Sequence, residues 1–471
     1  MTGDRAHQFR PRRLWLTAPA GGERHPYQAQ LQRADLLEKT GEWGLAEAAC
    51  RASADWCRRN GFRAELAEAI VWLCRLRRNM GKGDGQLPLV RESLEICEAL
   101  GDRRGVIRGH VNLGLVHALE GRLAEAAAEY RNAIALAGQT GLEWLSVSAL
   151  GNLAQVLMLQ GDYAESIAVN QRVIELGRAH GDDHSVANAH CNLGNVYFYQ
   201  GRYDRAMECY RFQASLSRAC GDIHAYSVAA GNIGNVHYQT GDPARAMERY
   251  REKLALSERL GFATGIGQAL GNIANILLDA GDVDGAIACD NRVLAIADHS
   301  GDAELQASGC IDLGCLLQIK GDDAAALAML DRAVAICRVS GVAYDLAMAL
   351  VKRADARLRL GDREGARADA AEGRAAAGRI GDDGIALEGA LIGARAEDDA
   401  GRGTALIEEL VAACRQEEHR AMALYELALL GGGPERCRRA LEACRSLEQR
   451  GPNYVNTLRV RELERRCPAG P

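Results

Sequence analysis

The densest set of potentially reactive side chains is His180-Gly-Asp-Asp-His184, which places two imidazoles and two carboxylates within five residues. Such groups could bind a metal ion. However, Gly181-Asp182 has the form of a helix stop followed by a helix N-cap, and the same dipeptide recurs along the chain. We therefore predict a turn at this position and no metal site.

Other patterns with catalytic potential are equally explained by turns. Gly81-Lys-Gly-Asp-Gly85 is glycine-rich but lacks the spacing of a phosphate-binding loop and a preceding strand. The acidic pairs Asp382-Asp383 and Asp398-Asp399 stand where helix caps are expected. The sequence thus predicts a protein that is not an enzyme, with no catalytic residues, no metal and no cofactor.

Asparagine recurs at fixed positions of a repeated helix. On a helical wheel these residues lie opposite the apolar stripe, and asparagine in mid-helix costs up to ~0.7 kcal/mol against alanine. Each amide either bonds to the neighbouring repeat, forming a structural ladder, or holds the backbone of an extended peptide, because an amide both donates and accepts hydrogen bonds. The first series is Asn112, Asn152, Asn192, Asn232 and Asn272, followed by Asp312, and the second is Asn195, Asn235 and Asn275.

Two tyrosines fall near the same helix face. Tyr199 and Tyr238, with Phe198 at the edge, belong to adjacent repeats. Aromatic side chains with polar neighbours are typical of binding hot spots. The alternative is that both rings pack against the next repeat. The eight asparagines and these two tyrosines together predict a groove that binds a partner.

The regular spacing of glycine predicts the helices and turns that position these side chains. It occurs nineteen times at a spacing of twenty, from Gly41 to Gly401, and ten of these glycines are followed by aspartate. Each follows a helical apolar stripe, such as Tyr203, Ala206 and Tyr210. Glycine is the usual left-handed stop of a helix, and aspartate is a good N-cap for the next one. Every unit is therefore predicted to be one helix of ~16–17 residues and a tight turn.

The helices alternate between two types, so the true repeat is forty residues. Type A helices carry the asparagines, and type B helices carry an alanine five residues after the glycine, as at Ala206 and Ala246. A period of about forty residues with two helices indicates an all-α solenoid, here of about nine or ten helix pairs. Pro88, after Gly83 and Gly85, predicts a distorted second repeat.

Composition excludes several other classes. The chain has 471 residues, 48% hydrophobic but only 5% aromatic, and a net charge of -6. That balance gives no basic stripe for nucleic acid, and no apolar run approaches the ~18 residues of a membrane span. The fifteen cysteines contain no Cys-x-x-Cys pair, and we expect reduced thiols in a cytoplasmic protein.

Three segments are predicted along the chain. Residues 1–26 form a flexible tail or, alternatively, a basic docking arm, and they lack the apolar core of a secretory signal. Residues 27–401 form the tandem repeats. Residues 402–471 form a degenerate helical cap or, alternatively, a separate docking helix. Helical patterns in this last segment lie at Thr404–Glu418, Arg420–Leu430, Glu435–Arg450 and Tyr454–Arg466.

These repeats resemble the tetratricopeptide repeat family. The residues that carry the resemblance are Leu193-Gly194, Tyr197, Gly201, Tyr203, Ala206 and Tyr210. The period is forty rather than thirty-four, which is similar to the repeats of Pins/LGN-type adaptors and of bacterial regulators. The resemblance implies a right-handed superhelix whose A helices line a concave groove. It also implies that asparagines at these two positions hold a bound peptide.

The leading hypothesis is a non-enzymatic scaffold that binds a peptide or helix of a partner protein in this groove. The alternative is a regulatory sensor that controls a separately encoded enzyme or transcription factor. Neither nucleic acid nor a membrane is an expected partner, and the sequence leaves the oligomeric state open. An enzyme within residues 402–471 is disfavoured, because no strand pattern or catalytic constellation occurs there.

Overall fold

A computed structural model describes residues 26–39, 42–79, 85–431, 433–450 and 454–466. The predicted tail, residues 1–26, lies outside the described residues except for Pro26. Throughout the described part the chain is helical and contains no strand. It divides into two compact units, residues 1–116 and 117–471, and each is described by itself.

The first unit holds four helices and most of a fifth. Its buried core includes Ile70 and Leu76. Pro88 stands in the first turn of the fourth helix, where proline is tolerated because the missing N–H would have no helical partner. The helices are α1 (Pro26–Lys39), α2 (Trp43–Asn60), α3 (Arg63–Asn79), α4 (Gln86–Ala99) and α5 (Arg103–Leu119).

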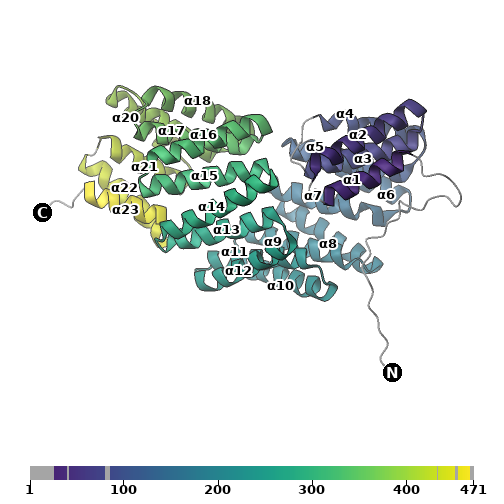
Figure 1. Ribbon diagram of the computed structural model, residues 1–471. Coiled ribbons are helices and arrows are strands. Elements are labelled where there is room, and N and C mark those ends of the chain that lie inside the picture. Colours follow the sequence, from purple (N-terminus) through teal and green to yellow (C-terminus); the bar gives the residue numbers. More distant parts are fainter. Residues whose placement is uncertain (1–25, 40–41, 80–84, 432, 451–453, 467–471) are drawn as a thin grey trace. The chain divides into compact units, whose positions relative to one another are not determined.

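The second unit continues with helix pairs through to the C-terminal helix. Figure 1 shows α13, α14, α15, α17 and α18 stacked in chain order. The helices are α6 (Leu123–Gln139), α7 (Val147–Leu159), α8 (Tyr163–His180), α9 (Asp183–Tyr199), α10 (Tyr203–Cys220), α11 (Ile223–Gln239), α12 (Pro243–Leu260), α13 (Ala263–Asp279), α14 (Val283–Ser300), α15 (Ala303–Lys320), α16 (Asp323–Ser340), α17 (Ala343–Arg359), α18 (Arg363–Ile380), α19 (Asp383–Arg395), α20 (Ala400–Ala413), α21 (Glu417–Gly431), α22 (Pro434–Arg450) and α23 (Tyr454–Arg466). A 3-10 turn, η1 (Glu143–Ser146), precedes α7.

The glycine-aspartate turn ends one helix and begins the next. Gly181 has φ +67°, and its N–H bonds to the carbonyl of Arg178 at 3.4 Å. The N–H of Asp182 bonds to the carbonyl of Gly177 at 2.8 Å, which completes a Schellman motif. The Asp182 carboxylate then accepts from the backbone N–H of Ser185 at 3.1 Å. Each such cap contributes about 1 kcal/mol.

The glycine lattice, meaning the predicted series of glycines at a spacing of twenty residues, is confirmed from Gly101 to Gly381. Every glycine of this series has positive φ there. Gly41 and Gly81 lie outside the described residues. At Gly401 the prediction is wrong: α19 already ends at Arg395, and Gly401 lies in the first turn of α20, which Asp399 caps. The lattice fails here because the turn after α19 has moved upstream of the twenty-residue step.

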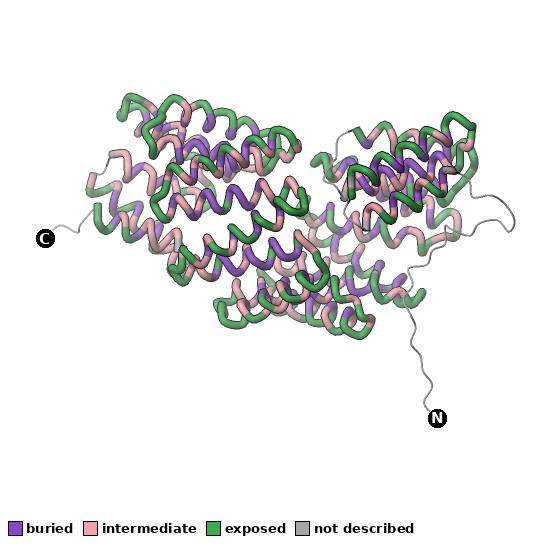
Figure 2. Tube along the Cα trace, viewed as in Figure 1, coloured by how far each residue is buried: buried purple, intermediate pink, exposed green. Residues whose placement is uncertain are grey.

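Alternating helices have different neighbours. The A helices contact one another directly, α7 with α9, α9 with α11, α11 with α13, and α15 with α17. Among the described helices no comparable backbone contact joins successive B helices. The backbones of α13 and α15 also lie farther apart than those of α11 and α13, although Leu305 of α15 packs against Gly267 of α13. Figure 2 shows buried residues recurring along each helix. The C-terminal helix α23 contacts α13.

Small residues allow the A and B helices of one pair to approach closely. A Cβ added at Gly194 would lie 2.4 Å from a ring carbon of Tyr210, and one added at Gly234 would lie 2.6 Å from the ring of Tyr250. Both tyrosines are buried. The glycine in one helix and the tyrosine sixteen residues later therefore form a single packing unit.

The C-terminal segment is helical as predicted, with α22 and α23 within one residue of the expected bounds. Its core includes Ile407, Leu427 and Leu463, all nearly fully buried. Cys437 is disulfide-bonded, so the expectation of reduced thiols is wrong at this position. Thirteen other cysteines are free, and seven of them are buried.

Candidate functional site on the A helices

The predicted groove residues lie on the A helices, and nine of the ten are in the second unit. Asn112 belongs to α5 in the first unit. The other residues are distributed over α7, α9, α11 and α13. Most are half-buried, whereas Asn275 and Tyr199 are exposed.

Part of the asparagine series forms hydrogen bonds within the protein. Tyr210 donates its hydroxyl hydrogen to Asn195 Oδ1 at 2.8 Å, and Tyr250 donates to Asn235 Oδ1 at 2.8 Å. Asn272 Nδ2 donates to the same Asn235 oxygen at 3.3 Å, which links α13 to α11. These contacts match the structural ladder that the sequence left open as one explanation.

Other asparagines keep their amides available. Asn232 Nδ2 has only a weak contact, with Cys191 Sγ at 3.5 Å. Asn152, Asn192 and Asn275 make no hydrogen bond to any part of the chain that the structure describes. The repeated series therefore contains both structural amides and uncommitted ones.

The two tyrosines have different surroundings. The Tyr199 side chain is 65% exposed at the end of α9, with its ring edge-on to Phe198 at 6.1 Å between centroids. Tyr238 is half-buried, and its hydroxyl donates to Asp279 on α13. Burial, and then that hydrogen bond, raise the pKa of Tyr238 well above its usual range. Neither ring lines the hollow described next.

A hollow of about 640 Å³ opens on the A-helix face between α11 and α15. Four of the predicted asparagines line it, Asn232, Asn235, Asn272 and Asn275. The remaining wall is formed by Lys253, Gly267, Gln268, Gly271, Ala274, Leu278, Asp290, Val293, Leu305, Ser308, Asp312, Cys315, Leu316, Ile319 and Val455. It lies beside α13 and α15, whose backbones are farther apart than those of α11 and α13.

Two sequence changes account for this hollow. Asp290 in α14 stands where α10 has Tyr210 and α12 has Tyr250, fifteen residues after the second asparagine of its pair. Ala274 stands where the two earlier A helices have Gly194 and Gly234. The tyrosine ring that fills the space between A and B helices in the two preceding pairs is therefore absent here, and a carboxyl group remains at the wall.

The hollow carries an unusual set of charges. Lys253 is 7% exposed and donates from Nζ to Gln268 Oε1 at 2.8 Å. Asp290 is 3% exposed. Burial lowers the pKa of Lys253 to about 8. Burial, and then the nearby charge of Asp312, raise the pKa of Asp290 to about 7. Neither residue was predicted from the sequence, although the break in the tyrosine series at Asp290 was a visible signal.

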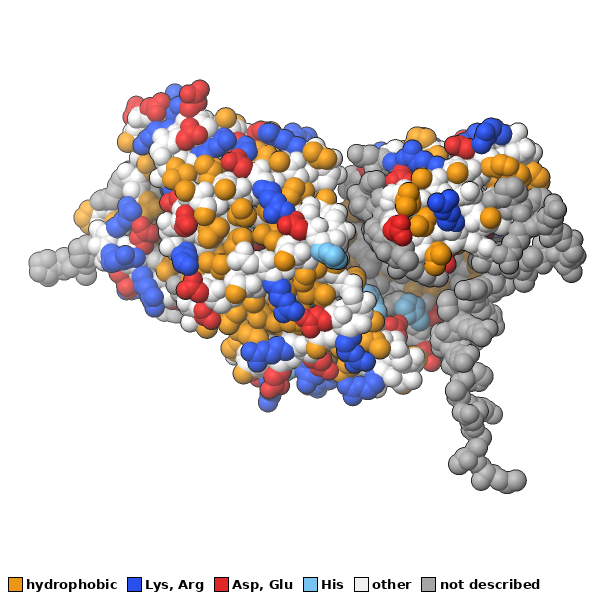
Figure 3. Space-filling model, viewed as in Figure 1, with side chains coloured by type: hydrophobic (Ala, Val, Ile, Leu, Met, Phe, Trp, Pro, Cys, Tyr) orange, Lys and Arg blue, Asp and Glu red, His pale blue; other side chains and the backbone are white. Residues whose placement is uncertain are grey.

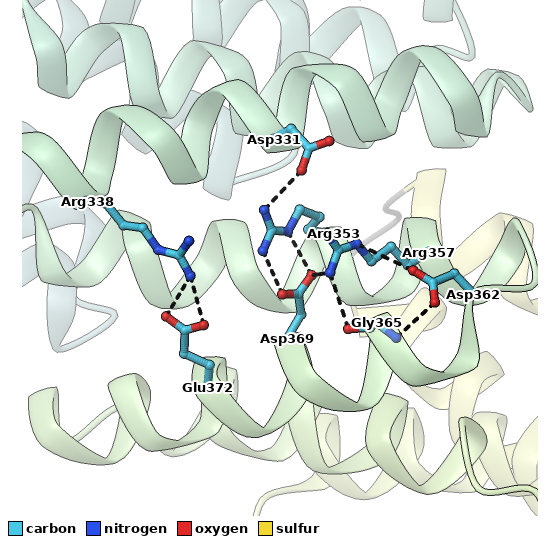
Figure 4. Close-up of polar contacts among 8 residues, drawn as sticks. All are labelled: Asp331, Arg338, Arg353, Arg357, Asp362, Gly365, Asp369 and Glu372. Atoms are coloured by element: carbon cyan, nitrogen blue, oxygen red, sulfur yellow. Dashed lines mark hydrogen bonds and ion pairs between the residues drawn. The ribbon is translucent and has the colours of Figure 1, made fainter.

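Buried charges elsewhere in the second unit are paired. Figure 4 shows Arg353 of α17 between two carboxylates, with Asp369 accepting from Nε at 2.7 Å and from Nη2 at 2.6 Å. Asp331 accepts from Arg353 Nη1 at 3.0 Å. Arg357 adds a second cation to Asp369 at 2.9 Å. This network holds α17 against α18 and leaves no group for a ligand.

The A-helix face changes character beyond the hollow. At the two asparagine positions α17 carries Lys352 and Asp355. Lys352 pairs with Glu388 of α19 at 2.6 Å, and Asp355 pairs with Arg395 at 2.9 Å. Charged pairs thus replace the amide contacts between successive A helices.

The first unit has a separate hollow of about 690 Å³ between α3, α4 and α5. Its wall includes Trp72, Arg75 and Arg108. Arg75 stacks over the Trp72 ring at 4.3 Å and pairs with Glu38 at 2.6 Å. Asn112 does not line this hollow, so the first unit offers no counterpart of the asparagine site.

The remaining sequence candidates have structural partners. His180 Nδ1 bonds to the Leu176 carbonyl at 2.8 Å, and His184 Nδ1 to Asp222 at 2.9 Å. No group of three or more potential metal ligands occurs among the residues described. Exposed arginines on the B helices form ion pairs, as Arg172 does with Glu143 at 3.0 Å.

The exposed face of the second unit mixes both charges with small apolar areas, as Figure 3 shows for one side of the molecule. No helix in the described part is long and apolar enough to span a membrane.

Stacked helix pairs with an open polar face define the class of this protein, an all-α repeat solenoid. One family model described as a tetratricopeptide repeat matches residues 145–211 and 265–339, and a second matches residues 107–132. These segments of the chain are therefore tetratricopeptide repeats. Proteins of this class generally serve as interaction scaffolds with extended binding surfaces.

Solved structures that resemble the chain have low sequence identity to it. A Signal Transduction ATPase with Numerous Domains protein with a tetratricopeptide repeat sensor, from Pyrococcus horikoshii, is 11% identical with a TM-score of 0.50, and the match covers 77% of this chain and 55% of that one. A Rap protein complexed with Competence and Sporulation Factor is 13% identical with a TM-score of 0.48, over 75% and 98% of the two chains. Aspartyl phosphate phosphatase F from Bacillus subtilis is 13% identical with a TM-score of 0.46, over 76% and 96%. No curated protein matches the sequence significantly.

Proposed function

We propose that this protein is a non-enzymatic scaffold that binds a peptide segment of a partner protein in the hollow between α11 and α15. The observation that carries the proposal is the hollow itself, a concave polar site lined by four amides of the repeated asparagine series. An amide can donate to a backbone carbonyl and accept from a backbone N–H of a peptide.

The dimensions favour a peptide segment over a whole domain. A volume of about 640 Å³ lies within the range of ~300–1,000 Å³ that is usual for ligand sites. That space holds a few side chains, while the flanking face of α9 and α11 offers Asn192 and Asn232 to the extended chain on one side. A cytoplasmic location belongs to the same proposal.

Two glycines at equivalent positions allow a matched test. A Cβ added at Gly271 of α13 or at Gly151 of α7 meets no atom within 4 Å, and neither residue has positive φ. Gly271 lines the hollow, whereas Gly151 does not. Gly271→Trp should therefore block the hollow without disturbing the fold, and Gly151→Trp serves as its control.

The probe is a displayed library of random short peptides selected on the full chain. We expect the wild type and Gly151→Trp to enrich the same peptides, and Gly271→Trp to lose at least about tenfold in affinity. Equal binding by Gly271→Trp would show that peptides do not occupy the hollow. If the natural partner found from such peptides is an enzyme or transcription factor whose activity changes on binding, the chain acts as a regulatory subunit.

A further inference from the structure

Lys253 and Asp290 are two buried charges without counterions. They come from successive B helices, α12 and α14, and both line the same hollow. Within the described ranges the Asp290 carboxyl group makes no hydrogen bond or ion pair, and the Lys253 ammonium bonds only to the neutral amide of Gln268. The charged group that affects the pKa of Asp290 is Asp312, whose charge is also negative.

This arrangement is unfavourable without a ligand. Burying an ion without a partner costs several kcal/mol even after the protein relaxes. The Arg353–Asp369 pair shows that buried charges in this unit can be fully matched. Both unmatched charges lie at the wall of one hollow, open to a bound group.

We propose that the hollow takes a segment of the bound peptide that carries both a basic and an acidic side chain. The lysine or arginine of the peptide pairs with Asp290, and the aspartate or glutamate pairs with Lys253. This inference rests on the proposed function and specifies the chemistry of the partner. Each pairing gives Asp290 or Lys253 a counterion that the described part of the chain does not provide.

The rest of the wall suits such a segment. Asp312 is exposed at the hollow and gives a second carboxylate, so a guanidinium can bond to both acids. Leu278, Leu316 and Ile319 offer apolar surface for the alkyl stem of a lysine or arginine. The amide of Asn275 is uncommitted and available to the peptide backbone.

Charge-removing variants with matched controls test each half of the proposal. Asp290→Asn and Lys253→Met remove one charge each from the hollow while keeping side-chain size. Asp284→Asn and Lys320→Met make the same substitutions at an exposed ion pair of α14 and α15 outside the hollow. Thermal unfolding of each variant shows that the chain is still folded.

The wild type should select peptides that contain both charges from the displayed library. Asp290→Asn should lose about tenfold in affinity for these peptides but not for versions with the basic residue changed to glutamine. Lys253→Met should show the same behaviour toward the acidic residue. The two control variants should bind as the wild type does.

Four results would overturn the inference. Selected peptides without charge preference, or equal effects of Asp290→Asn and Asp284→Asn, would remove the inference and leave the proposed function intact. Tighter binding of free arginine or glutamate than of capped peptides would assign the charges to a small molecule. Failure of the wild type to select any peptide better than Gly271→Trp removes the proposed function, and this inference with it.

Discussion

Asp290 occupies in α14 the position that Tyr250 occupies in α12, one repeat of forty residues earlier. Tyr250 is 2% exposed and bonds to Asn235, whereas Asp290 is 3% exposed and bonds to nothing that the structure describes. The repeat thus replaces a satisfied aromatic side chain by an unsatisfied carboxyl group. Such a local cost in a regular repeat is typical of functional positions.

Restoring the repeat should stabilise the protein and remove the hollow. Tyrosine at 290 needs glycine at 274, because a Cβ at the equivalent Gly234 would lie 2.6 Å from the tyrosine ring. We expect Ala274→Gly combined with Asp290→Tyr to raise the free energy of unfolding by about 1–3 kcal/mol, since a buried unpaired carboxyl is lost and a ring is packed. Urea denaturation measures this. A double variant no more stable than Asp290→Tyr alone would contradict the proposed packing unit.

Stability should depend on pH through Asp290. Its pKa rises from 3.8 to about 7 on folding. The folded state therefore keeps a proton that the unfolded state has released, and the free energy of unfolding falls as pH rises from about 4 to 7. Asparagine at this position cannot ionise, so the Asp290→Asn variant does not lose stability in this way. Its free energy of unfolding should exceed that of the wild type by about 2–4 kcal/mol at pH 8.

Three other titratable groups face the same hollow, Asp312, Lys253 and Cys315. They are present in both proteins, so the difference between wild type and Asp290→Asn isolates the Asp290 contribution. Denaturation of both proteins in urea at several pH values gives that difference. A constant difference between pH 5 and pH 8 would show that Asp290 ionises normally in the folded chain.

Removing Asp369 from the buried pair between α17 and α18 should lower the free energy of unfolding far more than removing Asp331, which contacts Arg353 from an exposed position. Asp369→Ala leaves the Arg353 guanidinium buried without its main partner, which we expect to cost about 3–5 kcal/mol. Asp331→Ala removes a contact of the same arginine from a side chain that is 51% exposed, and should cost less than about 1 kcal/mol. Similar losses in the two variants, measured by chemical denaturation, would refute this distinction.

Substitution by alanine should affect the stability differently at two glycines of the twenty-residue series. Gly361 has φ +89°, a conformation that costs alanine roughly 1 kcal/mol or more. Gly401 lies in the first turn of α20 without positive φ, and a Cβ added there would lie 3.1 Å from Asp399 Oδ1. The helical preference of alanine offsets this tight contact, so Gly401→Ala should change the stability by less than about 0.5 kcal/mol. Thermal melts of the two single variants compare these effects. A destabilised Gly401→Ala protein would indicate that the regular step extends to this residue.

The glycine period was sufficient to predict the helices, because helix stops are local. A left-handed glycine followed by an N-cap aspartate ends and begins helices through bonds within six residues, as at Gly181-Asp182. The error at Gly401 has the same origin, since spacing alone does not show that the turn after Arg395 occurs earlier. The disulfide at Cys437 was also missed, because pairing depends on distant parts of the chain.

The asparagine series was recognised, but its members were assigned one common role. Asn195 and Asn235 look alike in sequence to Asn275, yet the first two accept bonds from tyrosines and the third does not. The difference arises from residues fifteen positions away on another helix. Tyr199 and Tyr238 were grouped because both fall near one helix face in adjacent repeats, although one is exposed and the other bonds to α13.

The sequence by itself determined the helices, their turns and their pairing, because a repeated pattern of glycine, aspartate and apolar residues acts through near neighbours. Only the tertiary structure decided where the solenoid has an open site. A hollow forms where three helices fail to fill a common space, and the ionisation of Lys253 and Asp290 depends on how much protein surrounds them. Burial of that kind is a property of the packed helices, and no single segment of the chain contains it.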